Sequence, residues 1–287
     1  MEQQNTIYFQ LKTFLSSNLS SHKYVHLKLM DYKIDSKKDV TQLASALAKC
    51  SQASNMTIDL YENKIGQFGG SAIGTALASC LNLQAIQLIL ISCNLGDQGA
   101  VGSCSGLENC KNLKQLNLSL CQNKIGPNGA YNLGQILQKC NNLQDVEIDM
   151  SKNQIGDLGI SNFCSSLQSC QKLSRLSIWL NQGSISSSGI NSLSQALVNY
   201  PSLQILYLIF NENNITDSGV DQLGQALQNC QNLIYLFLLL EENSIYSQCQ
   251  QRIYRRIKKV KKLVNYYISF DNGHCCECDY EEEAYYE

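Results

Sequence analysis

Apolar residues in the middle of the chain follow two different periods, one after the other. The first part places leucines mostly two residues apart, at Leu113, Leu116, Leu118 and Leu120. A period of two is typical of a β-strand that buries one face. The second part spaces apolar residues as on one face of a helix, at Leu133, Ile136, Leu137 and Cys140. The pattern therefore predicts a strand followed by an amphipathic helix.

This strand and helix recur with a fixed period along the chain. Cysteines mark the end of each copy, at Cys50, Cys80, Cys110, Cys140, Cys170 and Cys230, with Tyr200 in the one remaining slot. Self-similarity at a fixed period of about 20–50 residues predicts a solenoid. We expect the periodic cysteines to be buried packing residues at the ends of the helices.

Two polar features recur with the same period. Asn123 follows the strand, and a buried asparagine there can bond the backbone of the adjacent turn and so stack one repeat on the next. Cys93 stands in the asparagine slot of its own copy. A Gly-x-x-Gly pair precedes the helix, and its second glycine returns at Gly69, Gly99, Gly129 and Gly219. We expect these glycines to form the tight loop between strand and helix.

The unit resembles the leucine-rich repeat in its ribonuclease-inhibitor-like form, which has a full helix in every repeat. The family pattern is Leu-x-x-Leu-x-Leu-x-x-Asn-x-Leu, and this chain adds one Leu-x pair, which keeps the phase of the strand. Long repeats poor in proline and rich in asparagine and glutamine also resemble a set of ciliate proteins. The resemblance covers roughly residues 21–270. It implies an α/β solenoid, a horseshoe with a concave parallel β-sheet and convex helices.

Three segments are expected along the chain. Residues 1–20 form an N-terminal cap, residues 21–260 form eight repeats of about 30 residues, and residues 261–287 form a capping strand and an acidic tail. The cap residues expected to cover the first repeat are Ile7, Phe9, Leu11, Phe14 and Leu15. The first strand is shifted by one residue and should bury Val25, Leu27 and Leu29.

Composition argues against several classes of function. A net charge of −2 and a pI near 6.0 argue against a general nucleic-acid binder. The sequence has no N-terminal signal and no apolar run of about 18 residues, so we expect no membrane span and a cytoplasmic protein with free thiols. No Gly-x-Gly-x-x-Gly or Gly-Lys-Ser/Thr occurs, and none of the three histidines lies in a nucleophile or metal motif. We therefore expect no enzyme and no cofactor.

Three other features have ordinary interpretations. In "HCCEC", residues 274–278, four ligands crowd into five positions and cannot easily close a tetrahedron, so no metal site is expected. The basic run 252–262 is expected to be the solvated face of a capping helix, paired with the acidic tail "DYEEEAYYE". The alternative for that run is binding to an acidic protein or to anionic lipid. Glu147 and Asp149 alternate on one strand, which is a weak signal for a glycosidase.

The residues between the leucine slots should point into the concave cavity. In the first half of the chain these positions are mostly polar, and from the sixth copy they become largely aromatic or aliphatic. Within "LIYLFLLLEEN", Leu236, Leu238 and Leu240 should face the core while Tyr235, Phe237 and Leu239 face the cavity. The predicted partner-binding residues are Arg175, Trp179, Ile205, Tyr207, Ile209, Tyr235, Phe237, Leu239 and Tyr267.

The most direct hypothesis is a non-enzymatic scaffold or adaptor that binds a protein partner on its concave face, because aromatic anchors dominate interface energies. The simplest alternative is that the tail or the C-terminal cap covers these residues. The resemblance also implies a second function, a GTPase-activating protein, for which Arg175 is the lone candidate arginine. A third hypothesis is an inhibitor that binds a basic enzyme through the acidic half of the concave face.

Overall fold

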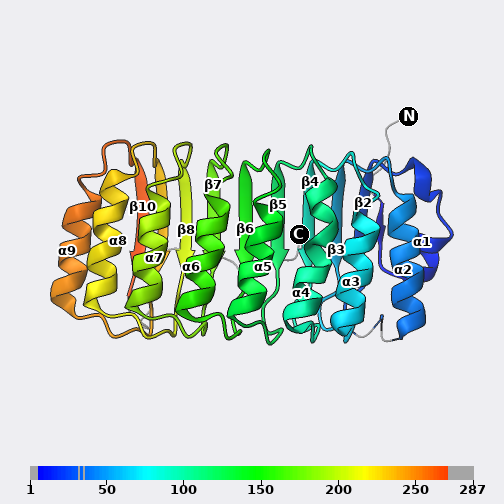
Figure 1. The fold of residues 1–287 in the computed structure, drawn as a ribbon, viewed down its shortest axis with the longest axis horizontal. Helices are drawn as coiled ribbons and strands as arrows, with labels where there is room; N and C mark the ends of the chain where they lie inside the picture. The colour runs from blue at the N-terminus through cyan, green and yellow to red at the C-terminus, as the bar shows by residue number, and fades with distance from the viewer. Residues whose placement is uncertain (1–5, 32, 35, 271–287) are drawn as a thin grey trace.

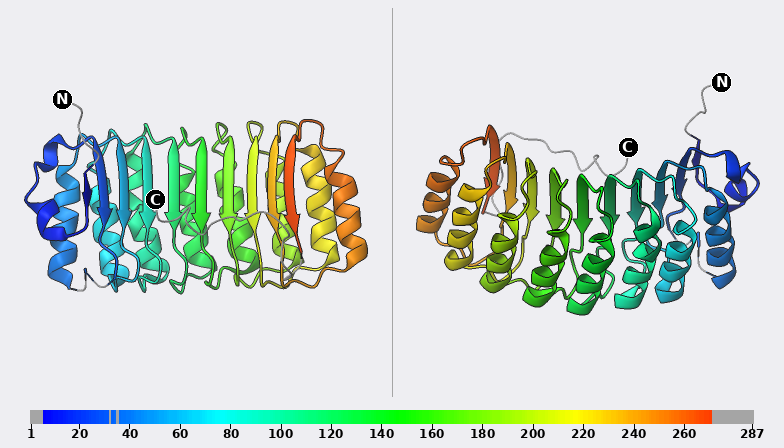
Figure 2. Two further views of the ribbon diagram at one scale, coloured as in Figure 1. Left: turned by 180° about the vertical axis from the view of Figure 1, so that it is seen from behind. Right: turned by 45° about the horizontal axis from the view of Figure 1, so that its top comes forward.

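Ten strands form one parallel sheet in the computed structural model, which describes residues 6–31, 33–34 and 36–270. Neighbours in the sequence are neighbours in the sheet, from β1 to β10. The register pairs residues thirty apart, from Asn55 with Ala85 to Tyr235 with Asn265. Helices α2 to α9 all lie on one face of the sheet, on the outside of a gentle curve (Figures 1 and 2). The sheet does not close, so the predicted α/β solenoid is confirmed.

The elements alternate regularly along the chain. The strands are β1 Ile7–Tyr8, β2 Tyr24–Lys28, β3 Asn55–Asp59, β4 Ala85–Ile89, β5 Gln115–Ser119, β6 Asp145–Asp149, β7 Arg175–Trp179, β8 Ile205–Ile209, β9 Tyr235–Leu239 and β10 Asn265–Ser269. The α-helices are α1 Leu11–Leu15, α2 Lys37–Lys49, α3 Gly66–Leu77, α4 Gly96–Cys104, α5 Pro127–Leu137, α6 Gly156–Leu167, α7 Ser187–Leu197, α8 Asp217–Asn229 and α9 Ser247–Ile257. Two short 3₁₀ helices, η1 Leu19–Ser21 and η2 Ser105–Asn109, complete the described elements.

The core lies between the sheet and the helices and runs along the whole solenoid. The leucine slots of β5 are buried, as are Ala130, Leu133 and Leu137 of α5. The shifted first strand buries Val25, Leu27 and Leu29. The six periodic cysteines are buried and carry free thiols, and Tyr200 in the seventh slot donates from its hydroxyl to the carbonyl of Cys164 at 2.7 Å. The predicted core positions are therefore confirmed.

A ladder of asparagines ties most repeats to the one before them. The Nδ2 of Asn123 donates to the Leu90 carbonyl at 2.6 Å, and its Oδ1 accepts from the N–H of Cys93 at 3.0 Å. The same type of contact recurs at Asn63, Asn153, Asn213 and Asn243. The thiol of Cys93 takes the same place and donates to the Leu60 carbonyl at 3.1 Å. The predicted stacking role of this slot is confirmed.

The two glycines of each Gly-x-x-Gly pair have different roles. In three of the pairs the first forms a left-handed turn, since Gly66, Gly96 and Gly156 have φ values of 60°, 59° and 61°. The second lies inside the helix. A Cβ on Gly99 would stand 2.9 Å from the Cα of Gln67, so this glycine lets α4 approach α3 closely. The expectation that both glycines serve the loop is therefore wrong for the second one.

The N-terminal end of the sheet is covered by a small cap. Phe14 is fully buried and its ring meets that of Tyr8 edge to face at 5.3 Å. Ile7 and Phe9 are 39% and 55% exposed, so they contribute less cover than expected. Strand β1 was not anticipated from the sequence; it adds two residues in parallel register to β2.

Within the described residues, no helix combines the length and apolar character needed to cross a bilayer.

Candidate functional site

The concave face of the sheet carries three columns of side chains, one residue per strand in each. The parallel register places Arg175, Ile205 and Tyr235 side by side in the first column. The second column continues with Tyr207, Phe237 and Tyr267, and the third with Trp179, Ile209 and Leu239. Adjacent strands lie about 4.8 Å apart, so these side chains form one surface. We call this set of nine residues the aromatic patch.

Four rings of the aromatic patch pack on one another. Tyr207 lies 5.3 Å from Tyr235 and 5.6 Å from Phe237 between ring centroids, and Phe237 stacks on Tyr267 at 5.1 Å. Each ring contact of this kind is worth about 0.5–1.5 kcal/mol. The structure therefore brings together the aromatic residues singled out in the sequence and holds them in a fixed arrangement.

The third column lies deeper than expected. Ile209 is only 5% exposed, and the same position is also buried in β3 to β6, at Asp59, Ile89, Ser119 and Asp149. Trp179 folds towards the second column and donates from Nε1 to the hydroxyl of Ser177 at 2.8 Å. Ser177 itself is buried. Ile209 thus supports the aromatic patch from below and adds little to its surface.

Arg175 joins the aromatic patch to the acidic strand β6. Its Nε lies 3.7 Å from a carboxylate oxygen of Asp145, and its Nη2 lies 3.8 Å from one of Glu147. Its guanidinium also sits 5.0 Å from the ring centre of Tyr207, a cation–π distance. An arginine finger would have to leave these three contacts to reach a bound nucleotide. The geometry of Arg175 thus counts against the GTPase-activating hypothesis.

The N-terminal half of the concave face forms a polar hollow of about 330 Å³. It is lined by side chains that include Asn55, Thr57, Gln87, Gln115, Asn117 and Glu147. Burial raises the pKa of Asp145 and of Glu147, and Arg175 opposes both shifts. Burial also raises the pKa of Asp149, whose carboxylate accepts from the N–H of Ser151 at 2.8 Å. The sequence showed the polar character of these positions but gave no sign of a hollow.

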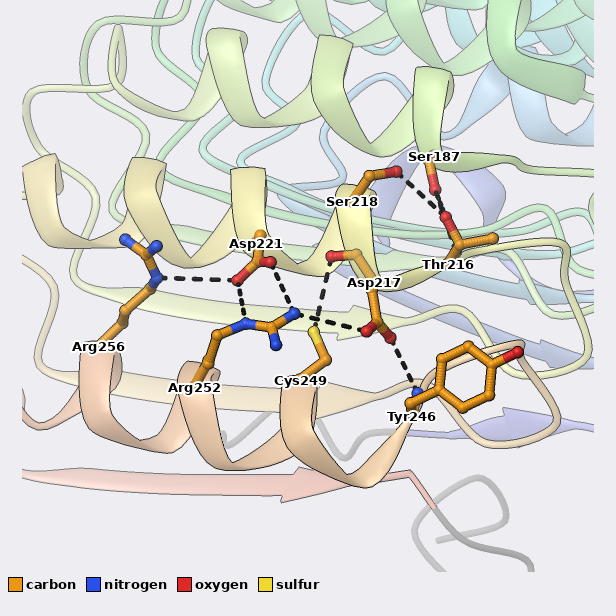
Figure 3. Close-up of polar contacts among 9 residues, drawn as sticks. All are labelled: Ser187, Thr216, Asp217, Ser218, Asp221, Tyr246, Cys249, Arg252 and Arg256. Carbon is orange, nitrogen blue, oxygen red and sulfur yellow. Dashed lines mark hydrogen bonds and ion pairs between the residues drawn. The ribbon is translucent and has the colours of Figure 1, made fainter.

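The basic helix α9 pairs with the preceding helix. Arg252 donates to both carboxylate oxygens of Asp221, at 3.2 and 2.9 Å, and reaches Asp217 at 3.4 Å (Figure 3). Arg256 lies 3.9 Å from Asp221. The hydrogen bond to Asp221 raises the pKa of Arg252. The expectation that the whole basic run is solvated is therefore wrong for its inner arginines, whose acidic partners belong to α8.

The outer residues of the basic run are exposed, as expected. They are Arg255, Lys258, Lys259, Lys261 and Lys262. Lys262 donates to the side-chain oxygen of Asn232 at 2.6 Å. The acidic tail that was expected to pair with this run lies outside the described residues, as does the "HCCEC" segment. Within the described residues, no group of three His, Cys, Asp or Glu side chains could hold a metal ion.

Part of the chain matches the model of a known family. A family model described as Leucine Rich repeat matches residues 109–134 and 139–164. Each matched span runs from the end of one helix through a strand and its asparagine turn into the next helix. No curated protein shows significant similarity to the chain.

Proposed function

We propose that this chain, which contains leucine-rich repeats, is a non-enzymatic scaffold or adaptor that holds a protein partner against its aromatic patch. Leucine-rich repeats are generally protein-interaction modules, and the aromatic patch supports the concave face as the surface that is used. The full helix in most repeats also supports assignment to the ribonuclease-inhibitor-like form. Ten buried free cysteines in the described part of the chain support a cytoplasmic location, where thiols stay reduced.

The observation that carries this proposal is the contrast between the two faces of the same strands. On the core side, Leu206, Leu208, Leu236 and Leu238 fill the slots that every repeat fills with apolar residues. On the concave side, Gln115 and Asn117 of β5 correspond to Tyr235 and Phe237 of β9. Strand β5 forms with polar residues at these positions, so aromatic residues there are not needed for folding. Aromatic anchors are the side chains that contribute most to interface energies.

The arrangement also reduces the cost of binding. The rings of Tyr207, Tyr235, Phe237 and Tyr267 already pack on one another, so a partner that contacts them orders little side-chain freedom. Beside the patch, strand β6 presents Asp145 and Glu147, which line the polar hollow. We therefore expect a partner segment that is apolar over β8 and β9 and polar or basic over β5 and β6.

Affinity capture with matched variants tests the proposal. One variant carries Trp179→Ala and Phe237→Ala on the concave face, and the control carries Phe68→Ala and Tyr131→Ala, which are 46% and 41% exposed on convex helices. A hot-spot aromatic contributes about 2 kcal/mol, so the concave variant should lose each partner about 20-fold or more in affinity. The control should bind normally. Partners that bind both variants equally would place the interface elsewhere.

A further inference from the structure

The polar hollow of the concave face exists because one small residue stands between larger ones. In the first column of concave side chains, Ala85 lies between Asn55 on β3 and Gln115 on β5. The residues in the same column further along the sheet are large, such as Ile205 and Tyr235. A methyl group between two longer side chains leaves space above the sheet, and the hollow of about 330 Å³ includes this position. A change in side-chain size at one position thus helps to form the hollow.

The neutral lining of the hollow consists of side chains that can bond a peptide backbone. Thr57, Gln87 and Asn117 stand side by side in the second column, and Gln115 stands in the first. A carboxamide has one acceptor oxygen and two N–H donors, which complement the N–H and C=O of a peptide unit. The side chains of Gln87 and Gln115 form no hydrogen bond with any described residue. The lining therefore suits an extended segment, whose backbone groups are unpaired, better than a helix, which pairs its own.

The charged end of the hollow carries more negative than positive charge. Asp145 and Glu147 share one guanidinium, that of Arg175, at nitrogen-to-oxygen distances of 3.7 and 3.8 Å. These distances exceed the roughly 2.7–2.9 Å of a charge-assisted hydrogen bond. Within the described residues, the two carboxylates accept one side-chain hydrogen bond, from Nδ2 of Asn117 to Glu147 at 3.1 Å. A carboxylate has about four lone-pair sites, so most of their acceptor capacity is unused.

Partial burial makes this imbalance unfavourable. The side chains of Asp145 and Glu147 are 33% and 22% exposed, so both have lost part of their contact with water. A cation that donates directly to the two carboxylates would replace the lost hydrogen bonds and balance the second negative charge. An acidic or wholly apolar segment in the hollow would instead remove the remaining water and leave the carboxylates without a new partner. The hollow therefore favours a basic side chain.

We propose that the polar hollow binds an extended segment of the protein partner through an arginine or lysine side chain. The cationic group of that side chain donates to Asp145 and Glu147, while the neighbouring peptide groups pair with the carboxamides of the lining. This inference rests on the proposed function, since the same segment would continue across β7 onto the aromatic patch. Arg175 joins the two surfaces, because its guanidinium also lies 5.0 Å from the ring centre of Tyr207. The partner segment is thus basic at one end and apolar at the other.

Peptide selection on the full chain tests the basic residue first. The wild-type protein selects from a displayed library of random peptides, and the best binder is synthesised with a copy in which its basic residue is replaced by Gln. We expect the selected peptides to carry an arginine or lysine beside apolar residues. The Gln copy should bind with an affinity lower by about tenfold or more. Selected peptides without a basic residue, or a Gln copy that binds equally well, would overturn the proposal.

Two variants of the chain then locate the basic residue. Asp145→Asn with Glu147→Gln removes the charge at nearly constant shape, whereas Ala85→Ile fills the hollow and keeps both carboxylates. Strand β8 carries Ile205 in the same column, so a strand of this sheet accepts that side chain. Each variant should lower the affinity for the basic peptide by about tenfold or more and change the affinity for its Gln copy little. Unchanged binding of the basic peptide in either variant would count against the hollow as its site.

Controls separate this inference from the proposed function. Glu212→Gln with Glu242→Gln removes the same charge from exposed loop residues and should leave peptide binding unchanged, with urea unfolding confirming that every variant is folded. An equal loss in this control would show general attraction between charges and would overturn the inference. Trp179→Ala with Phe237→Ala tests the aromatic patch. Peptides that depend on the patch and not on the hollow would refute this inference alone, whereas peptides that depend only on the hollow would refute the role of the patch.

Discussion

Two adjacent leucines of β9 provide the sharpest test of how the strands are oriented. Leu238 is fully buried in the core, while Leu239 points to the concave side and is half-buried. Both are leucines of the same strand and are adjacent in sequence. We predict that Leu238→Ala destabilises the protein strongly and that Leu239→Ala does so only weakly.

The expected magnitudes follow from burial. Truncating a fully buried leucine removes transfer free energy and leaves a cavity, which together cost about 2–5 kcal/mol. Leu239 borders the solvent on the concave side, so its truncation leaves an open notch that water fills, and we expect a loss of about 1 kcal/mol. Tyr207→Ala would be a less clean probe, because Tyr207 loses two ring contacts and the Arg175 contact at once.

Equilibrium unfolding in urea measures both losses. The urea concentrations at the midpoints of unfolding should differ clearly between the two variants. The dependence of the unfolding free energy on urea concentration should be the same, since both variants expose nearly the same surface on unfolding. Leu239→Ala should still weaken partner binding, whereas Leu238→Ala should affect binding only where it unfolds the chain. Equal losses of stability in the two variants would refute the assigned orientation of β9, and with it the aromatic patch.

Three further outcomes follow from single contacts. Asn213→Ala should lower the free energy of unfolding by about 3 kcal/mol, because it removes the buried partners of the Leu180 carbonyl and the Ile185 N–H. Asn232→Ala at the surface should lower it far less, and urea unfolding of the two variants compares them. Thiol labelling of the native protein should find Cys121, which is half-buried, reacting ahead of the ten buried cysteines of the described residues, with urea releasing the rest. Burial raises the pKa of Asp149 above 3.8, so the stability linked to its protonation is lost as pH rises through the folded pKa. Near pH 7, Asp149→Asn should therefore have a larger free energy of unfolding than the wild type. This difference should shrink on acidification when unfolding is measured across pH.

The fold was predictable because its determinants are local and periodic. The strand slots at Leu116 and Leu118, the helix face at Leu133 and the asparagine at 123 each depend on spacing within a single repeat. Because the same spacing recurs every thirty residues, a pattern that is weak in one repeat becomes clear over the whole chain. The same reasoning found that Cys93 replaces asparagine, because a thiol can donate one hydrogen bond in that slot.

Other features depend on neighbouring repeats and were not predictable from spacing. Ile209 is buried like Asp59, Ile89, Ser119 and Asp149 at the same position of β3 to β6, and the alternation along one strand does not reveal that this column lies deep. The partners of Arg252 lie thirty-one and thirty-five residues earlier, in α8, and their match depends on how two helices pack. Residue-by-residue alternation fixes which side a residue occupies but not how deeply the residue is buried or which residues of the next repeat it meets.

The sixth repeat shows how this lateral coupling serves the site. Gly183 stands in the asparagine slot, so the ladder has no side-chain donor between Asn153 and Asn213. The interruption coincides with the change from the polar to the aromatic half of the concave face. Arg175 spans this junction, since it contacts Asp145 on β6 and Tyr207 on β8. Arg175 therefore links strands β6, β7 and β8 on the concave side, in the same repeat that lacks the asparagine.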